Sequence, residues 1–225
     1  VEIKGPQNHV TAADREVEEL IVRSLSKSFP GDVFFGEEGG GQAGERVWII
    51  DPIDGTTNFV HGLPEFGVSI GFVRGNEAEI GVIYLPVTDE LFAAKRGGGA
   101  TRNRRPIRVS RTTDIAHGMM CLGFSYRRTV PEFAAVTERL LSAHCEYRRF
   151  GSCVHGMAYV ADGRMDGYYE EHINSWDVIA GLVLVREAGG WTNDFLSGEW
   201  LTEGNPILAC TPGLREQLQA LTEVA

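Results

Sequence analysis

The distribution of apolar and polar residues predicts five helices in the chain. In the first, Val17, Leu20, Ile21 and Leu25 form one face of a helix that begins at Thr11 and ends at Pro30-Gly31. Residues 178–189 are apolar on nearly all sides, which is typical of a helix buried around its whole circumference. The predicted helices cover residues 11–29, 130–144, 151–161, 175–188 and 212–221.

β-rich apolar runs separated by short turns dominate the chain after Phe59. The turn-like segments 74–76 and 86–89 leave too few residues for the crossovers that parallel strands need. The pattern therefore predicts an antiparallel meander within a mixed α/β or α+β protein, not a Rossmann-type sheet. The predicted strands are 33–35, 47–50, 66–72, 78–85, 90–94, 107–109, 147–150, 164–171 and 207–210.

No internal repeat or Pro/Ser-rich linker divides the chain. With 225 residues it can form one large domain or two closely packed halves. We expect a single domain, residues 1–225. Its possible halves are residues 1–112, carrying metal and phosphate chemistry, and residues 113–225, carrying the substrate contacts, with a boundary near residues 111–115.

Composition and charge narrow the possible partners. A formal net charge of −10 argues against general nucleic-acid binding, which depends on Lys and Arg. A small anionic substrate remains compatible, because a bound cation can invert the local field. No run approaches membrane-spanning length, no signal peptide is visible, and the four cysteines show no CxxC spacing. We therefore expect a cytoplasmic protein with free thiols and no nucleic-acid or membrane partner.

The strongest local signal for chemistry is the segment Asp51-Pro52-Ile53-Asp54-Gly55. It follows the apolar run 47–50, so a buried strand would end by presenting two carboxylates, followed by a turn rich in small donors. Carboxylate oxygens on a rigid turn suit Mg²⁺, and a Gly-Thr-Thr turn at a helix start can offer N–H groups to a phosphate. The alternative is an Asx-turn in which Asp54 caps a helix. These residues alone leave both interpretations open.

Other acids have structural interpretations of similar weight. Asp14 and Asp177 each lie in the first turn of a predicted helix, where an acid complements the helix dipole, and Ser175 is the expected cap of the second helix. Glu37 and Glu38 lie between glycines and fit a solvated acidic turn. Two successive strands nevertheless each end in acids, which favours their convergence.

Three segments share a pattern beyond these local signals: Gly36-Glu37-Glu38, the stretch from Asp51 to Phe59, and the stretch from Trp176 to Gly190. Together they resemble the inositol monophosphatase family of lithium-sensitive, magnesium-dependent phosphatases. A weaker match is Val10 to Asp14 with Lys4 upstream. The resemblance covers nearly the whole chain. It implies a layered αβαβα sandwich with a second, smaller sheet, and usually a homodimer.

The resemblance also implies a ligand set for two to three Mg²⁺ ions. Glu37, Asp51 and the Ile53 carbonyl match ligands of a first ion, and Asp51, Asp54 and Asp177 match ligands of a second. Glu37 would also help to hold a third ion, with Glu38 beside the ligands. The chemistry agrees, because several carboxylates cannot share a pocket in ionised form without cations. Lys4 would lie near the third ion or the phosphate, or would be a solvated loop residue.

The remaining roles follow from the same resemblance. Asp14 and Thr56, with Glu37, match the residues that activate water, and Gly55 and Thr56 match phosphate-binding positions. Asp177, Glu170 and the segment Gly151-Ser152-Cys153 match substrate contacts. Cys153-Val154 replaces two small alanines of the commoner pattern, which affects the preference for the leaving group.

The predicted activity is Mg²⁺-dependent hydrolysis of a small polyol or sugar phosphate, with inositol monophosphate favoured. Alternative substrates are histidinol phosphate, fructose 1,6-bisphosphate and a 3′-phosphonucleotide. An alternative of another class is a non-catalytic regulatory binding protein that keeps the pocket. The complete set of acids argues against that alternative, because a binding protein has little need of a water-activating pair.

Overall fold

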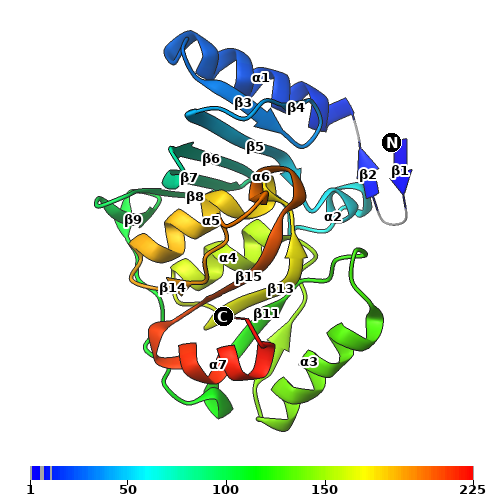
Figure 1. Ribbon diagram of the computed structural model, residues 1–225, viewed down its shortest axis with the longest axis vertical. Helices are drawn as coiled ribbons and strands as arrows, with labels where there is room; N and C mark the ends of the chain where they lie inside the picture. Colours follow the sequence, from blue (N-terminus) through cyan, green and yellow to red (C-terminus); the bar gives the residue numbers. More distant parts are fainter. Residues whose placement is uncertain (1, 6–7, 11, 225) are drawn as a thin grey trace.

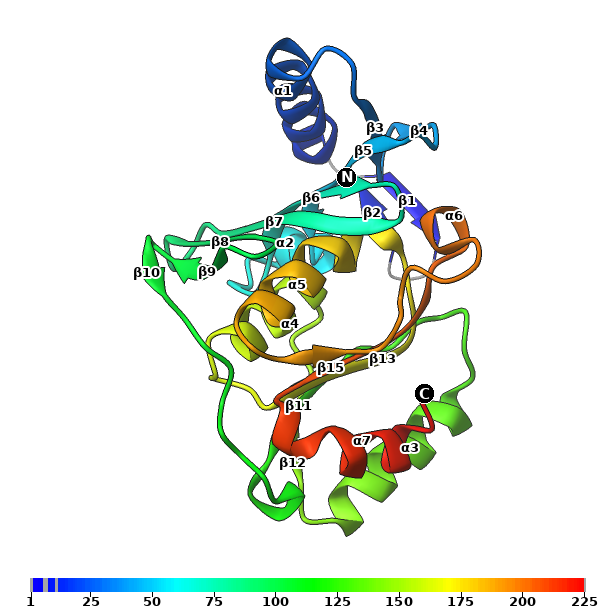
Figure 2. The ribbon, with the colours of Figure 1, turned by 60° about the vertical axis from the view of Figure 1, so that its left-hand side comes forward.

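The protein is built from five layers that alternate helices and sheets (Figure 1). The computed structural model describes residues 2–5, 8–10 and 12–224, and side chains from residue 12 onward. Figure 2 shows α1 outermost, then a large sheet, then α4 and α5, then a smaller sheet, and then α3 and α7. The helix bounds are α1 Ala12–Ser28, α3 Val130–Ser142, α4 Cys153–Ala161, α5 Ser175–Glu187 and α7 Arg215–Thr222. The predicted αβαβα sandwich with two sheets is confirmed.

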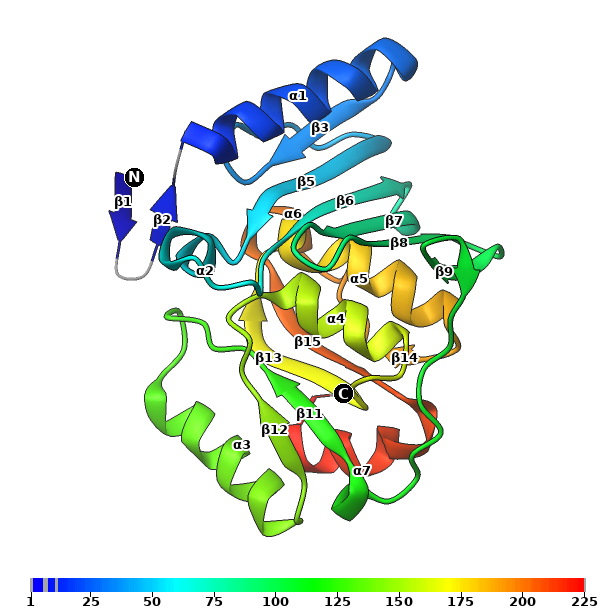
Figure 3. The same ribbon diagram turned by 180° about the vertical axis from the view of Figure 1, so that it is seen from behind.

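The large sheet has eight strands in the order β10-β9-β8-β7-β6-β5-β3-β4. Every neighbouring pair is antiparallel except β3 and β5, which confirms the predicted meander. The bounds are β3 Val33–Gly36, β4 Gly40–Gly41, β5 Arg46–Asp54, β6 Gly67–Arg74, β7 Glu77–Leu85, β8 Glu90–Lys95, β9 Gly99–Arg102 and β10 Arg105–Pro106. In Figure 3 the hairpin of β1 (Glu2–Gly5) and β2 (Asn8–Val10) lies beside α2 (Thr56–His61).

Two predictions for residues 1–112, the strand at 107–109 and the helix start at Thr11, are not confirmed. The predicted strand 107–109 is wrong: the Ile107 N–H donates to Ala100 O and the Val109 N–H to Ala188 O, so successive bonds go to different elements. Ile107 and Val109 are apolar because they pack against the core from a connecting segment. Thr11, the predicted start of the first helix, lies outside the described residues, and the helix is described from Ala12.

The smaller sheet separates two hydrophobic cores. Its order is β12-β11-β13-β15-β14, with bounds β11 Met119–Leu122, β12 Glu146–Arg148, β13 Gly167–Ile173, β14 Trp191–Thr192 and β15 Asn205–Cys210. Successive side chains point to opposite faces, so Tyr168 joins the core around α4 and α5, whereas Tyr169 joins the core under α3 and α7. The remaining short elements are 3₁₀ turns at Ile115–His117 and Pro212–Leu214 and helix α6, Trp200–Glu203. All four cysteines are buried free thiols.

Helix α5 lies between the two sheets, which explains why its sequence is apolar all round. Its contact with the large sheet is very close. Gly71 and Gly81 are cross-strand partners on β6 and β7, and a Cβ on Gly81 would lie 2.2 Å from the carbonyl oxygen of Ala180. Within the described part of the chain, neither α5 nor any other helix is long and apolar enough to cross a membrane.

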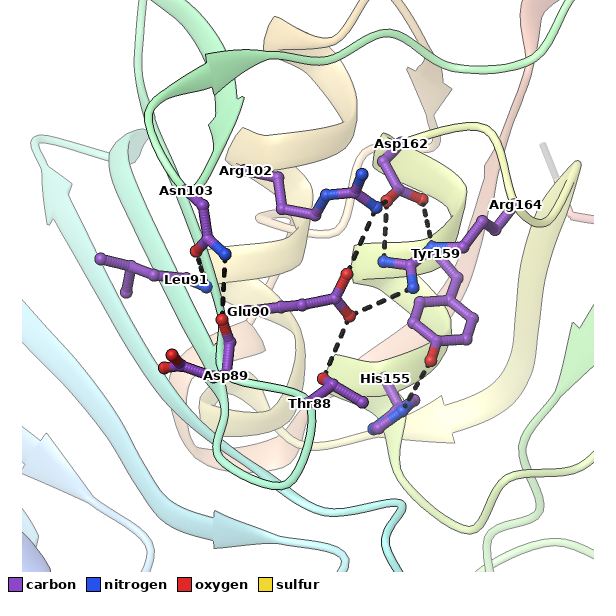
Figure 4. Close-up of polar contacts among 10 residues, drawn as sticks. All are labelled: Thr88, Asp89, Glu90, Leu91, Arg102, Asn103, His155, Tyr159, Asp162 and Arg164. Atoms are coloured by element: carbon purple, nitrogen blue, oxygen red, sulfur yellow. Dashed lines mark hydrogen bonds and ion pairs between the residues drawn. The ribbon is translucent and has the colours of Figure 1, made fainter.

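A square of alternating charges ties the end of α4 to the large sheet (Figure 4). Arg102 lies 2.6 Å from Asp162 and 3.3 Å from Glu90, and Arg164 lies 2.7 Å and 3.1 Å from the same two acids. The Arg164 guanidinium also lies over the ring of Tyr159, at 3.8 Å. Each charge thus has two opposite neighbours, so the C-terminal end of α4 is held while its N-terminal end faces the site described below.

The contact of α5 with the glycine pair gives a first prediction. Gly81→Ala should lower the free energy of unfolding by about 1–3 kcal/mol, because the new methyl group meets backbone atoms of α5 that cannot move independently. Chemical denaturation monitored by circular dichroism measures the change. Gly31→Ala is the matched control, since nothing lies within 4 Å of its Cβ position, and it should change the value by less than about 0.5 kcal/mol. Equal effects of the two substitutions would contradict this packing.

Candidate active site

A cavity of about 470 Å³ opens where β5 ends, beside the first residues of α2, α4 and α5. Three helix starts therefore meet the end of a buried strand. Eleven of the twelve predicted site residues line the cavity: Glu37, Asp51, Ile53, Asp54, Gly55, Thr56, Gly151, Ser152, Cys153, Glu170 and Asp177. The twelfth, Asp14, lies behind the wall and is fully buried.

Asp51, Asp54 and Asp177 form the centre of the site. Each offers a carboxylate oxygen, and the three oxygens lie within 4.8 Å of one another. β5 continues through Asp54, so both of its aspartates belong to the strand and not to a following turn. The Oδ1 atom of Asp51 accepts a hydrogen bond from the Ile53 N–H at 2.9 Å, the short-range bond of an Asx-turn. Its Oδ2 atom is buried and has no hydrogen-bond partner among the described residues.

Asp54 does not cap α2. The N-cap of α2 is Gly55, whose φ of 89° lies in the left-handed region that favours glycine. The Asp54 carboxylate instead accepts hydrogen bonds from the Ser152 hydroxyl at 2.5 Å and from the Val154 N–H at 2.8 Å. The start of α4 therefore positions Asp54, although the two segments are about one hundred residues apart. Of the alternative to a metal site, an Asx-turn with Asp54 as a helix cap, the structure shows the Asx-turn bond at Asp51 and no cap by Asp54.

Asp14 reaches the site through Thr56. The Thr56 hydroxyl oxygen lies 3.2 Å from Oδ1 of Asp14 and 2.8 Å from the carbonyl oxygen of Ile53. A hydroxyl has one proton, so it can donate to one of these acceptors at a time. The structure thus brings together Asp14 and Thr56, which the sequence paired only through a family resemblance.

Glu37 and Asp177 both line the cavity and come from different elements. The Glu37 N–H donates to the carbonyl of Ile50 at 3.1 Å, which places Glu37 beside the strand that carries Asp51. Asp177, in the first turn of α5, accepts a hydrogen bond from the Asn174 N–H at 3.2 Å. The prediction of Ser175 as the helix cap is wrong: Asn174 is the N-cap, and the Ser175 hydroxyl donates to Leu201 O at 2.8 Å.

β13 and the start of α4 supply a further part of the cavity wall. Glu170 is buried, and its Oε2 atom accepts a hydrogen bond from the Tyr168 hydroxyl at 2.6 Å. Ser152 and Cys153 are also buried. The Ser152 hydroxyl orients Asp54 through its hydrogen bond, and the Cys153 side chain adds bulk to the cavity wall. The side chain of Lys4, for which two interpretations were open, lies outside the described residues.

Comparison with known proteins now identifies the family. The profile of the inositol monophosphatase family matches residues 1–224. The chain belongs to this family. It is 42% identical over 217 residues to the inositol-1-monophosphatase of Mesorhizobium japonicum, which covers 93% of this chain and 80% of that protein. It is 39% identical over 225 residues to the Nus factor SuhB of Pasteurella multocida, with 97% and 84% covered.

Solved structures agree with this assignment. The extragenic suppressor protein suhB of Bartonella henselae superposes with a TM-score of 0.91 at 35% identity, covering 99% of this chain and 87% of that one. The names of these relatives divide between a phosphatase and a Nus factor. Membership of the inositol monophosphatase family therefore fixes the fold and leaves the activity to be argued from the site.

Burial, together with mutual repulsion at Asp51 and Asp177, raises the pKa values of the acids in the site. Burial raises the pKa of Asp177 to about 8, with further contributions from the charges of Asp54 and Glu170. Burial also raises the pKa of Asp54 to about 6, against the lowering effect of its bonds from Ser152 and Val154. The pKa of Asp51 lies well above its usual range, because of burial and the charges of Glu37, Asp54 and Asp177. Without a counter-ion these carboxylates cannot all be ionised near neutral pH.

The donor set fits a hard divalent cation. Mg²⁺ prefers oxygen ligands, and the three clustered aspartates together with the Ile53 carbonyl supply only oxygen. The unpartnered, buried Oδ2 of Asp51 is the observation that tests the fit, since a buried carboxylate oxygen normally has a partner. A cation would supply the missing partner and relieve the repulsion.

Several residues at the site were not predicted from the sequence. The Asn58 side chain donates to Glu65 O at 2.6 Å and to Phe150 O at 2.7 Å, which fixes the loop before α4 beside α2. Arg127 and Arg149 line the outer part of the cavity and bring positive charge to it. Asn58 belongs to the motif after Asp54, but no sequence pattern indicates that the two arginines lie near the same pocket.

The raised pKa values predict how stability depends on pH. A carboxylate with a pKa of 3.8 when unfolded and about 6 or 8 when folded binds more protons in the native state. The metal-free protein should therefore lose stability as pH rises through the window from about 4 to 8. We expect its Tm to fall by on the order of 5 °C between pH 5 and pH 8.

Differential scanning calorimetry with a chelator measures this slope. Asp177→Asn should flatten it, because the amide does not titrate, whereas the exposed control Glu216→Gln should leave it unchanged. Adding Mg²⁺ should also flatten the slope. A metal-free Tm that rises steadily from pH 5 to pH 8 would contradict the electrostatic description of the site.

Proposed function

We propose that this protein is a Mg²⁺-dependent phosphomonoesterase that hydrolyses a small polyol or sugar phosphate, with inositol monophosphate as the favoured substrate. The observation that carries the proposal is the meeting of the aspartate cluster with the Asp14–Thr56 pair at one end of β5. A protein that only binds phosphate needs neither a buried acid behind a hydroxyl nor several carboxylates in one wall. The inositol-1-monophosphatase name of one relative points the same way.

Five groups would hold the metal: the carboxylates of Glu37, Asp51, Asp54 and Asp177, and the Ile53 carbonyl. When bound, Mg²⁺ neutralises the acids and polarises the phosphate and the attacking water. Two to three ions are the proposed number, because the family resemblance assigns Glu37, Asp51 and the Ile53 carbonyl to one ion and Asp51, Asp54 and Asp177 to another, with Glu37 helping to hold a third.

Asp14 and Thr56 would provide the general base. A water near the Thr56 hydroxyl can give its proton to that oxygen while the hydroxyl proton passes to Asp14, 3.2 Å away. Asp14 is fully buried, so a proton that it accepts is shielded from bulk solvent. The N–H groups of Gly55 and Thr56 would hold the phosphate for in-line attack, with Glu37 helping to orient the water.

The leaving alcohol would lie between the start of α4 and β13. Glu170 would accept a hydrogen bond from a substrate hydroxyl, and its carboxylate is already oriented by Tyr168. Gly151, Ser152 and Cys153 would form the adjacent wall, with Asp177 contacting both metal and substrate. The bulk of Cys153 would favour a compact ring over a larger leaving group.

A second candidate is a regulatory binding role, which a relative named as a Nus factor favours. Related phosphatase substrates, namely histidinol phosphate, fructose 1,6-bisphosphate and a 3′-phosphonucleotide, remain within the same chemistry. We further propose a cytoplasmic homodimer whose subunit is a single domain, residues 1–225, divisible into halves 1–112 and 113–225, with no nucleic-acid partner. The net charge of −10 supports the last point.

A phosphate-release assay tests the proposed activity. Inositol 1-phosphate and the three alternative substrates are compared with and without Mg²⁺, and with Li⁺ as an inhibitor. Asp14→Asn should lower kcat by about 10²-fold or more, since it removes the proton acceptor. Asp51→Asn should abolish Mg²⁺-dependent release, while the exposed control Glu216→Gln should behave as wild type.

Two outcomes would overturn this assignment. No Mg²⁺-dependent release from any of the four substrates would leave the regulatory role as the better interpretation. Full activity of the Asp51→Asn variant would contradict the proposed role of Asp51 as a metal ligand in the reaction.

A further inference from the structure

A second buried acid, Glu18, lies one helical turn after Asp14 on α1 and makes contacts that the proposed chemistry does not use. Its side chain is 8% exposed. Its Oε2 atom accepts a hydrogen bond from the Glu38 N–H at 3.0 Å, and its Oε1 atom accepts one from the Gly39 N–H at 2.7 Å. One carboxylate thus holds two consecutive backbone amides of the loop that begins with Glu37.

The glycines of this loop fit around the Glu18 carboxylate. A Cβ on Gly36 would lie 2.4 Å from Oε2 of Glu18, and a Cβ on Gly39 would lie 2.7 Å from Oε1. Any larger residue at either position would displace the carboxylate or the loop. The two glycines that flank Glu37 and Glu38 are therefore explained by the approach of a side chain from α1.

Glu37 is consequently held from both sides. Its own N–H bonds to Ile50 O, next to Asp51, at 3.1 Å, and the amides that follow it bond to Glu18. Glu37 and Asp51 line the same cavity. Since these like charges repel, a restraint on the Glu37 loop is needed to keep it at the cluster.

Helix α1 carries both restraints on one face. Asp14 and Glu18 are four residues apart, so they project from the same side of the helix. Asp14 contacts Thr56 at the start of α2, and Glu18 holds the Glu37 loop. A buried carboxylate beside an acidic pocket is unfavourable unless charge-assisted hydrogen bonds offset its burial, and the two amides supply them.

We infer that Glu18 is a positioning residue that holds Glu37 against the aspartate cluster and thereby sets the affinity for Mg²⁺. The inference rests on the proposed function, because it assumes that Glu37 contributes to metal binding. Glu18 itself touches neither the cluster nor the substrate cavity. It acts through the Glu38 and Gly39 amides.

Isothermal titration calorimetry with Mg²⁺ tests the inference without an activity readout. Glu18→Gln keeps the side-chain volume and one acceptor but turns an amide NH₂ group toward the other loop N–H. We expect the Mg²⁺ Kd to rise about tenfold, and kcat to recover at saturating Mg²⁺. Hydrogen exchange at the Glu38 and Gly39 amides should accelerate. The control is Glu19→Gln, which removes the same charge from the exposed neighbouring residue. It should leave the Mg²⁺ Kd, kcat and the exchange of the two amides unchanged.

A second variant approaches the contact from the loop. Gly39→Ala adds a methyl group against Oε1 of Glu18 from an exposed position, and it decides the question if Glu18→Gln does not fold. It should also raise the Mg²⁺ Kd. A wild-type Kd in a folded variant of either kind would overturn the positioning role. Wild-type protein that binds no Mg²⁺ would overturn the proposed function, and the metal part of this inference with it.

Discussion

The burial of several carboxylates in one cavity, with the repulsion among them, is the constraint on which the structure around the cavity depends. Three carboxylate oxygens, one each from Asp51, Asp54 and Asp177, lie within 4.8 Å of one another. The negative charge of Glu37 further raises the pKa of Asp51. A protein gains no stability from such an arrangement, as the raised pKa values of Asp54 and Asp177 show. The cluster is explained if a cation binds there, because cation binding to the native state stabilises the protein and offsets the free energy lost by burying the acids.

The rest of the fold holds these acids at their positions. The apolar helix α5 is fixed between two sheets by the close approach at Gly81, so Asp177 at its start cannot retreat from the cluster. The start of α4 donates two hydrogen bonds to Asp54, and its far end is bound to the large sheet by the charges around Asp162. Helix α1 supplies Asp14 and Glu18 from the other side of the same sheet (Figure 1).

Most helices and strands were predictable, because their periodicities are local and strong, whereas the layered αβαβα arrangement followed from the family resemblance. Residues 107–109 were misjudged as a strand because apolar side chains that pack from a connecting segment look like a strand in sequence. For the site, Asp51 and Asp54 were visible from the residues, whereas the roles of Asp14 and Glu37 depended on a family resemblance. Glu18 gave no signal, and Asn58 lay in a recognised motif without a predicted contact, since their partners, such as Gly39 and Phe150, are set by the tertiary fold.

The central claim is that the aspartate cluster at the end of β5 binds divalent cations directly. The most direct measurement is anomalous diffraction from crystals soaked in Mn²⁺ as a substitute for Mg²⁺. The account predicts anomalous peaks in the cavity in direct coordination by Asp51, with Asp54 and Asp177 as further ligands. Well-ordered crystals that show no peak among these three aspartates, or peaks only elsewhere on the protein, would contradict it.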